Sequence, residues 1–460
     1  MPYLNLQKLR LLDYRCFESI DVEFHHQLTV LVAANGAGKT SILDAIAVAF
    51  GPYIGAFDEA VGKHFEPSDI RLTQIRQTAT NEMEYAPKGV RLEVTGFIPG
   101  SLIDSLGNDH APSTWQRVLT SPTKAKTTIK DAKDLIDYGK RMQEAVRTPG
   151  RDVLLPLIAY YGTGRLWQQK KQKKEPWAKR IQRTSRTIGY TDCLDPASKY
   201  KSFVEWFRYW SVNAKDMQLK EQSDTPAYKE FASYIASVKD AVSACLISAG
   251  WKEIEYSFKL DTLVAHHDLH GELPVELLSD GIRNMIGMVA DIAFRATKLN
   301  GQLGAQAAAR TPGIVLIDEV DMHLHPEWQQ VVLQSLTQAF PAVQFIVTTH
   351  SPQVLTTVPR ESIRVIECDE SGSRARMPDF SPLAHESGDA LAKIMGTHRE
   401  PPLPLQERIR EFEQLVRAGM ENSSDARQLR AELDEAGYQI HESDLTTWRF
   451  LAARNEGKRN

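Results

Sequence analysis

The amino-acid sequence predicts an α/β fold, a mixed sheet with flanking helices. Three apolar segments predict it, each followed directly by residues that can bind a ligand or take part in a reaction. Residues 28–32 (LTVLV) precede a glycine-rich loop and then a helix. Residues 314–318 form an apolar strand that ends in adjacent carboxylates, and residues 344–349 form another that ends at His350. Strands that are apolar along their whole length are typical of buried parallel sheets.

The other elements of the first half follow in order. Short runs rich in apolar and β-branched residues predict strands at 4–17, 20–24 and 90–98. Residues 41–50, directly after the glycine-rich loop, read as a buried helix. The stretch 107–130 is polar and contains two prolines, so it is predicted to be an insertion or mobile loop.

The second half alternates between strands and helices and then becomes helical. A strand is predicted at 153–161 and a strand-like segment at 254–265. Helices are predicted at 203–212, 228–248 and 325–340, and another opens at 277–284 (LLSDGIRN). Residues 404–454 predict two or three amphipathic helices, whose shared apolar face carries Leu405, Ile409, Phe412, Leu415 and Val416.

Composition excludes several classes of protein. Of 460 residues 42% are hydrophobic and 25% charged, which is ordinary for a globular chain. The net charge of −4 does not by itself indicate a nucleic-acid partner. The apolar stretches 45–50 and 154–161 fall far short of the ~20 residues of a membrane span, and no signal-peptide layout is present. We therefore expect a cytoplasmic protein with no membrane contact.

Four scattered cysteines are expected to be reduced thiols: Cys16, Cys193, Cys245 and Cys368.

The glycine-rich segment 33–40 (AANGAGKT) lies between a strand and a helix, which is the context that a phosphate-binding P-loop requires. Gly36 and Gly38 let successive backbone N–H groups face an anionic phosphate at the helix N-terminus. Lys39 is expected to reach the β- and γ-phosphates, and the Thr40 hydroxyl to bind Mg²⁺. ATP and Mg²⁺ are therefore the predicted cofactors.

One residue departs from the P-loop pattern. Its first glycine is replaced by Ala33, at a position where the backbone need not approach phosphate closely. The residues predicted to contact the nucleotide in this loop are Asn35, Gly36, Ala37, Gly38, Lys39, Thr40 and Ser41.

Two further strand ends are predicted to complete the site. Asp318 is expected to bind Mg²⁺ together with Thr40, and Glu319 to polarise the attacking water as general base. His350 is expected at the same edge of the sheet, where a neutral imidazole can contact the γ-phosphate or the water. Lys39, Glu319 and His350 are thus the predicted catalytic residues.

Two other segments carry possible binding groups. In LLSDGIRN, Ser279 and Gly281 present a hydroxyl and free N–H groups where a helix begins, although a plain N-cap would also explain the serine. Residues 165–186 contain nine Lys/Arg and one acidic residue, with two tryptophans interleaved. This run predicts either a contact with a DNA or RNA backbone or a solvated charged loop.

In this order the four motifs resemble the SMC-like class of ABC-type ATPases, with LSDGIR similar to the signature LSGGQ. Asp280 and Ile282 are the departures. The resemblance implies an ABC-type P-loop ATPase head with a helical insertion and a helical C-terminal tail. It also implies a homodimer or higher homo-oligomer in which Ser279 and Gly281 of one subunit complete the ATP site of another. Gln168 or Gln169 becomes the candidate Q-loop residue.

The expected division of the chain follows from the same resemblance. Residues 1–100 would form the N-terminal lobe of the ATPase and 101–260 the helical insertion with the Q-loop. Residues 261–370 would form the C-terminal lobe with the signature, the acidic strand and His350, and 371–460 the helical tail.

DEVDMHLHP (318–326), together with DYRCF (13–17) and YGTGRLW (161–167), looks more specifically like the ATPases of bacterial anti-phage defence, the OLD-like and Septu groups. The resemblance is strongest to the Septu ATPase family, PtuA, and no Toprim domain follows the ATPase. It implies an ATPase that controls a partner HNH endonuclease (PtuB-like) and does not cut nucleic acid itself. The alternative is a DNA-repair type SMC-like or OLD-like ATPase that acts on DNA directly.

Overall fold

The computed structural model describes residues 3–76, 82–99, 112–121, 128, 130–165, 185–196, 200–246, 250–369, 372–398 and 403–456. They form two compact units, Met1–Ala390 and Leu391–Asn460. Across these described ranges, none of the helices combines the length and the apolar character needed to cross a membrane.

The central sheet of the first unit has the strand order β15-β14-β3-β13-β12-β8. Every neighbouring pair is parallel except β14 and β15. The strands β3, β13, β12 and β8 are buried along their whole length, which confirms the prediction from the apolar runs. Their bounds are β3 Leu28–Val32, β8 Leu157–Tyr161, β12 Gly313–Ile317, β13 Val343–Thr348, β14 Ile363–Asp369 and β15 Gly372–Arg376.

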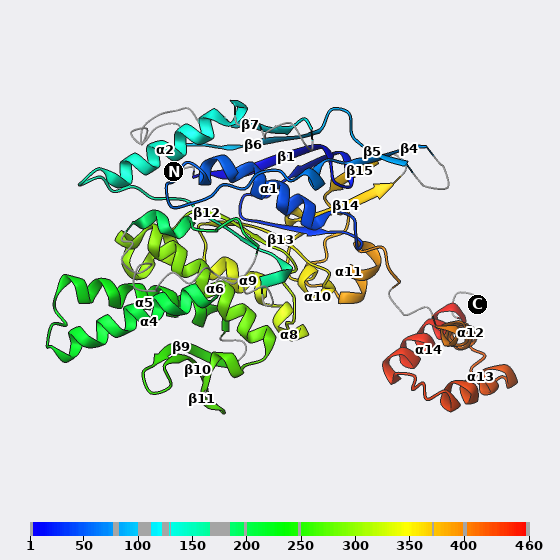
Figure 1. Cartoon of the computed structure of the whole chain (residues 1–460). Helices are drawn as coiled ribbons and strands as arrows, with labels where there is room; N and C mark the ends of the chain where they lie inside the picture. Colours follow the sequence, from blue (N-terminus) through cyan, green and yellow to red (C-terminus); the bar gives the residue numbers. More distant parts are fainter. Residues whose placement is uncertain are drawn as a thin grey trace. The chain divides into compact units, whose positions relative to one another are not determined.

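A second, antiparallel sheet has the order β2-β1-β6-β7 and lies across α1 from the central sheet (Figure 1). Its strands are β1 Asn5–Tyr14, β2 Phe17–Glu23, β6 Val90–Phe97 and β7 Ser113–Leu119. Helix α1 (Lys39–Ile54) is buried over most of its length because it contacts both sheets.

The loop predicted at 107–130 is wrong in part, because β7 lies inside it. Trp115 and Arg117 face α1 and are fully buried; the indole donates to Ala49 O at 3.1 Å and the guanidinium to Val48 O at 2.7 Å. The buried charge of Arg117 is compensated by backbone carbonyls, and burial lowers its pKa to about 10.

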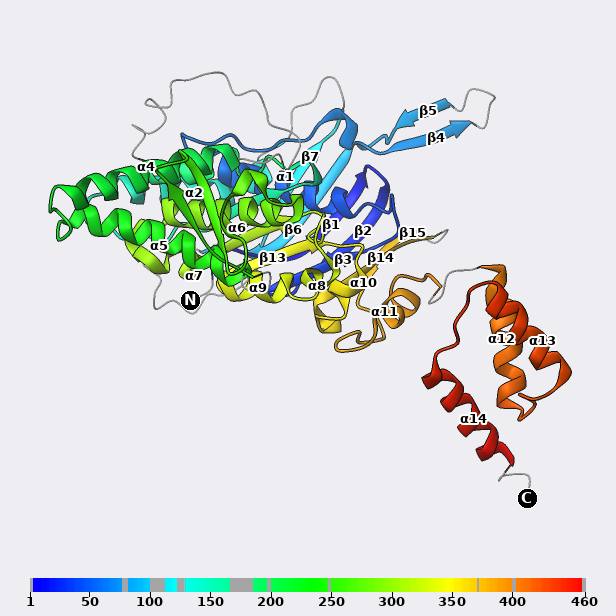
Figure 2. The same cartoon turned by 90° about the horizontal axis from the view of Figure 1, so that it is seen from below.

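The helices α4 (Tyr200–Leu219), α5 (Pro226–Leu246) and α6 (Asp280–Leu299) pack side by side in both views (Figures 1 and 2). The predicted strand-like segment 254–265 is two strands, β9 (Trp251–Ser257) and β10 (Thr262–His267), joined by a turn in which Asp261 has a φ of 51°.

The helix predicted at 325–340 is also divided, into α8 (Pro326–Gln329) and α9 (Val332–Ala339). His325 caps α8, since its Nδ1 accepts from Glu327 N. The Gln329 amide donates to Leu324 O at 2.9 Å and accepts from the Ser351 hydroxyl at 2.7 Å, which holds the short α8 against the segment after β13.

The remaining elements are short or peripheral to the sheets, apart from α2, which packs on α1. They are α2 Lys133–Arg147, α7 Ala307–Arg310, α10 Pro352–Leu355, α11 Ser387–Lys393, β4 Leu72–Arg76, β5 Glu82–Tyr85, β11 Gly271–Pro274, and the 3₁₀ turns Pro67–Asp69, Lys130–Ala132, Thr163–Arg165, Arg186–Tyr190, Val275–Leu277, Gly301–Gln306 and Arg360–Ser362.

The second unit contains α12 (Pro404–Arg417), α13 (Ser424–Glu435) and α14 (Glu442–Glu456), as the amphipathic pattern predicted. Its helices share one core, made of Ile409, Phe412, Val416, Ala426, Leu429, Leu433, Leu445 and Trp448. The predicted apolar face of α12 is thus covered by the two helices that follow it.

Candidate nucleotide-binding site

The glycine-rich loop connects β3 to α1 and depends on two left-handed glycines, Gly36 with φ +78° and Gly38 with φ +91°. A Cβ on Gly38 would lie 2.3 Å from Phe17 Cζ and 2.7 Å from Cys16 Sγ, so only glycine fits there. The loop is therefore packed against the turn between β1 and β2. Residues 13–17, singled out in the sequence as DYRCF, include this turn.

Lys39 is the first residue of α1, and its side chain bends back over the loop. The Nζ atom donates to Ala33 O at 3.0 Å and to Ala34 O at 3.3 Å. Burial lowers the pKa of Lys39, and the carboxylates of Asp318 and Glu319 oppose that shift by favouring the charged form. A cation that is partly buried in this way gains from an anion in the loop.

Asp318 follows β12 directly and is 2% exposed. Its Oδ2 accepts from the Thr40 hydroxyl at 2.8 Å, and its Oδ1 accepts from the Thr348 hydroxyl at 2.6 Å. Its backbone N–H donates to Tyr161 O at 2.8 Å. The structure thus brings together the two residues predicted to bind Mg²⁺, Thr40 and Asp318, from elements far apart in sequence.

Thr348 is a residue that the sequence analysis missed. Besides bonding Asp318, its hydroxyl accepts from Glu319 N at 2.7 Å, so one side chain holds both residues of the acidic pair. The sequence did carry a signal for Thr348: it is a polar residue at the end of the mostly apolar strand β13, which pairs with the strand that precedes the two carboxylates.

Glu319 and His350 lie at the same edge of the sheet because β12 and β13 are parallel neighbours, with Ile317 in register with Val347. Glu319 has a φ of 48°, a left-handed backbone that non-glycine residues seldom adopt. Such strain is often found at functional sites. Both side chains are partly exposed and so are accessible to a ligand at this edge.

Ser279 and Gly281 lie at the start of α6. Ser279 occupies the N-cap position, but its hydroxyl makes no capping hydrogen bond, so the plain N-cap interpretation does not account for it. A Cβ on Gly281 would lie 2.3 Å from His323 O, so the start of α6 packs closely on the turn after Asp318. Within the described ranges, neither residue hydrogen-bonds to the glycine-rich loop of its own chain.

A buried ion pair connects α6 to the central sheet. Arg295 Nε donates to Asp291 Oδ2 at 2.7 Å, and the Tyr161 hydroxyl donates to the same oxygen at 2.7 Å. The two charged side chains are 6% and 4% exposed. Since Tyr161 also accepts the N–H of Asp318, this network connects α6 to the acidic strand through β8.

Most of the basic run 165–186 lies outside the described residues, including the Q-loop candidates Gln168 and Gln169 and both tryptophans. Arg186, at its end, is described. Its guanidinium donates to Leu299 O and Val153 O at 2.8 Å each, so it links the end of α6 to the segment that precedes β8.

We expect Thr348→Val to lower the free energy of unfolding by about 1–3 kcal/mol, because it leaves a buried carboxylate oxygen without its donor. Urea denaturation of the two proteins measures the difference. Thr337→Val is the matched control, since that hydroxyl bonds only carbonyls of its own helix, Leu333 O and Gln334 O. Equal loss of stability in both variants would contradict a special role for Thr348.

Two family descriptions match this chain. One, "AAA domain", matches residues 8–235, and the other, "AAA domain, putative AbiEii toxin, Type IV TA system", matches residues 215–356. The two matches together run from β1 to α10. They therefore include the glycine-rich loop, the start of α6, the acidic strand and His350.

Two curated relatives match over most of their length. The chain is 25% identical to the "Retron Vc95 probable ATPase" of Vibrio cholerae serotype O1 biovar El Tor, over 93% of this chain and 86% of that protein. It is 26% identical to the "Retron Ec83 probable ATPase" of Escherichia coli, over 94% and 84%. A shorter segment, 17% of this chain and 10% of the relative, is 42% identical to the "Septu protein PtuA" of Bacillus mycoides (strain KBAB4).

Among solved structures, an Smc head bound to the C-terminal winged-helix domain of ScpA covers 82% of this chain and 97% of its own, at 15% identity and a TM-score of 0.46. The glycine-rich loop between β3 and α1 and the acidic end of β12 both lie within the residues that the two AAA descriptions match. The chain is therefore similar to AAA-domain proteins and, among the named relatives, to the retron and Septu ATPases.

Proposed function

We propose that this chain binds ATP with Mg²⁺ and hydrolyses it, as the ATP-driven subunit of an antiviral defence complex. One observation carries the proposal: Lys39 and Thr40 at the start of α1 meet Asp318 and Glu319, which follow β12, at one edge of the sheet. A polyphosphate bound together with a divalent cation would use all of these groups at once, the ammonium on the phosphates and the carboxylates on the cation and the water.

The donor set fits Mg²⁺, which takes carboxylate, hydroxyl and phosphate oxygens. Thr40 and Asp318 would hold the ion, since their oxygens already lie 2.8 Å apart. When bound, the ion would neutralise charge on the terminal phosphates. Lys39 and the backbone N–H groups from Asn35 to Ser41 would bind the phosphates themselves.

Glu319 would orient the attacking water and accept its proton, and His350 would contact the γ-phosphate. The hydrogen bond from Glu319 N to Thr348 supports this role, because it holds the backbone of the base beside the Mg²⁺ ligand Asp318. Positioning of this kind is a major source of catalysis in phosphoryl transfer.

We propose further that two copies pair so that Ser279 and Gly281 of one complete the ATP site of the other. The uncapped Ser279 hydroxyl supports this arrangement, since it is left for a ligand. ATP binding would then hold the dimer together and hydrolysis would release it, which a partner protein can sense as two states.

The partner we propose is an HNH endonuclease (PtuB-like). The similarity to a Septu protein PtuA and to retron ATPases supports a role within a defence complex. In this proposal the residues that converge on the glycine-rich loop act on the nucleotide, and cutting of nucleic acid belongs to the partner.

Reconstitution tests the proposal. The purified chain with ATP, Mg²⁺ or Mn²⁺ and plasmid DNA should leave the DNA intact, and nicks should appear only after an HNH endonuclease (PtuB-like) is added. The ATP dependence of nicking should disappear in Lys39→Ala. Metal-dependent cleavage by the isolated chain would refute the division of labour, and ATP-dependent DNA binding without a partner would favour the DNA-repair alternative.

A further inference from the structure

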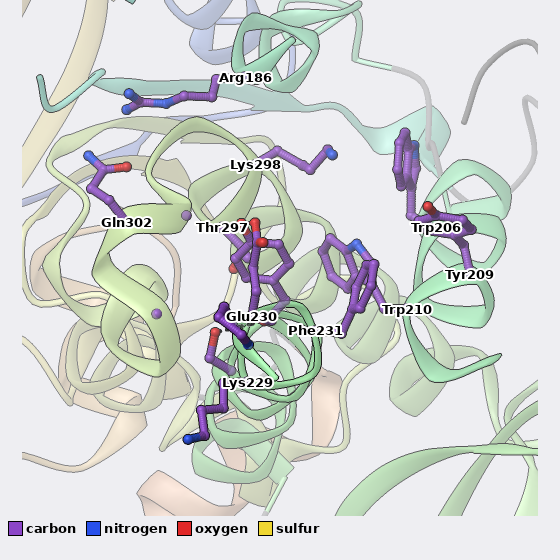
Figure 3. Close-up of a pocket in the computed structure, with 15 residues that line it drawn as sticks. Arg186, Trp206, Tyr209, Trp210, Lys229, Glu230, Phe231, Thr297, Lys298 and Gln302 are labelled. Atoms are coloured by element: carbon purple, nitrogen blue, oxygen red, sulfur yellow. Dashed lines mark hydrogen bonds between the residues drawn. The ribbon is translucent and has the colours of Figure 1, made fainter. Parts of the chain in front are cut away.

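A cavity of about 820 Å³ lies between α4, α5 and the C-terminal end of α6 (Figure 3). Its volume is within the range of small-molecule sites. The described residues that line it include none from the glycine-rich loop or the acidic pair. Five of the described lining residues are aromatic: Trp206, Tyr209 and Trp210 from α4, and Phe231 and Tyr234 from α5.

The aromatic rings of this cavity do not stack on one another. Trp206 and Tyr209 meet at 89° with centroids 5.9 Å apart, and Tyr209 and Phe231 meet at 83° with centroids 5.8 Å apart. Trp206 and Trp210 are buried, whereas Tyr209, Phe231 and Tyr234 are partly exposed and so offer ring surface to another planar group.

Lys298, at the end of α6, extends toward Trp206 in Figure 3, and its Nζ lies 3.9 Å from the centre of that indole ring. Burial lowers the pKa of Lys298 to about 8, although Glu230 favours its charged form. Within the described ranges, the ammonium has no hydrogen bond or ion pair with a side chain or backbone atom. A desolvated ammonium held mainly by a cation–π contact is under-compensated, so an anion would stabilise it.

The other charged residues of the cavity are engaged elsewhere or point away. Arg186 donates to Leu299 O and Val153 O and points away from the aromatic rings (Figure 3). Lys229 is exposed and also points away (Figure 3). The Glu230 carboxylate accepts from the Tyr234 hydroxyl. Lys298 is thus the cation directed at the aromatic walls.

We propose that this cavity is a second nucleotide site, in which the base stacks on the aromatic side chains and the phosphate binds Lys298. A plain anion would not use the aromatic faces, and a cation would be repelled by Lys298. A nucleoside phosphate supplies both the planar ring and the negative charge, and base–aromatic stacking contributes about 1–3 kcal/mol per base. The nucleotide can be free or part of a single-stranded oligonucleotide.

The test uses the full chain carrying Lys39→Ala, so that the glycine-rich loop contributes little. Isothermal titration with 5′-AMP and, separately, with a ten-nucleotide single-stranded DNA gives the affinities, and tryptophan fluorescence provides a second signal. Lys298→Met removes the charge but keeps the apolar stem over Trp206. Lys229→Met is the matched control, since it removes an exposed cation of the same cavity.

Binding of 5′-AMP should weaken at least tenfold in Lys298→Met and stay unchanged in Lys229→Met. Adenosine, which lacks the phosphate, should bind more weakly and be insensitive to Lys298→Met. If the oligonucleotide shows the same Lys298 dependence, the natural ligand is a nucleic-acid strand; if 5′-AMP alone shows it, the ligand is a free nucleotide.

Tyr209→Leu removes a partly exposed ring from the cavity wall and leaves Lys298 unchanged; it should weaken 5′-AMP binding several-fold. Absence of binding by both probes, or equal affinity of the Lys298→Met and parent proteins, would overturn the second site. Residual binding of nucleotide at the glycine-rich loop would not depend on Lys298. The effect of Lys298→Met therefore tests the second site independently of whether the chain is an ATPase.

Discussion

Replacing Glu319 with glutamine should leave ATP binding intact and slow hydrolysis by about 10²–10⁴-fold, the usual contribution of a general base. Glutamine keeps the size and the hydrogen-bonding capacity of the side chain but cannot accept a proton at neutral pH. The backbone at Glu319 stays anchored through its N–H to Thr348. Phosphate release measures turnover, and filter binding of labelled ATP measures retention.

Because the phosphate cradle is unchanged, the Glu319→Gln protein should keep ATP bound and, in our proposal, stay dimeric during size-exclusion chromatography. Glu327→Gln is the control, since that exposed carboxylate lies in the first turn of α8 and away from the strand end. A Glu319→Gln protein that hydrolyses ATP at the parent rate would remove Glu319 from the chemistry.

Replacing Lys39 with alanine should weaken ATP binding by about 10- to 150-fold, because a charge-assisted hydrogen bond contributes about 1.5–3 kcal/mol. The Lys39 ammonium is the cation that lies within the loop, over Ala33 O and Ala34 O. Titration with ATP and Mg²⁺ measures the loss. Lys88→Ala, at an exposed turn between β5 and β6, should bind as the parent does.

Lys39→Ala also tests the proposed pairing of two copies, in which Ser279 of one copy completes the ATP site of the other. Neither Lys39→Ala nor Ser279→Arg should hydrolyse ATP alone, but an equal mixture should recover about a quarter of the parent activity. Random pairing makes half of the dimers mixed, and each mixed dimer holds one intact site. Equal ATP binding by Lys39→Ala and the parent would refute the site, and a mixture without recovery would refute the pairing.

Local sequence was sufficient to predict the strands of the central sheet and the loop between β3 and α1. Each of these strands is buried on both faces, so most of its residues are apolar. The glycines of the loop are needed because the backbone turns left-handed at Gly36 and Gly38. The burial of a strand and the turn of a loop both leave a mark on consecutive residues, as apolar runs in the strand and as glycines in the loop. Both features can therefore be predicted from local sequence.

Sequence also predicted that the C-terminal segment is helical, and the apolar spacing around Phe412 selected the face that packs. It could not decide what covers that face. In the structure α13 and α14 cover it, since Ala426, Leu433 and Trp448 belong to the same core.

What depended on tertiary structure was the pairing of polar groups across the fold. Arg117 lies in a segment predicted to be a loop, yet it is buried in β7, where the carbonyls of Val48 and Thr128 accept from its guanidinium. Asp291 and Arg295 lie on a helix face that is otherwise apolar, and their pairing with Tyr161 requires α6 to lie against β8.

The acidic strand end shows the same division. Sequence alone determined that a phosphate-binding loop, a pair of carboxylates and His350 would each follow a buried strand of an α/β sheet. Only the tertiary structure decided that Thr348 holds Asp318 and Glu319 together, and that Lys298 lies against Trp206. The physical reason is that a buried polar group needs a partner in space, and the partner's position along the chain leaves no periodic signal in the sequence.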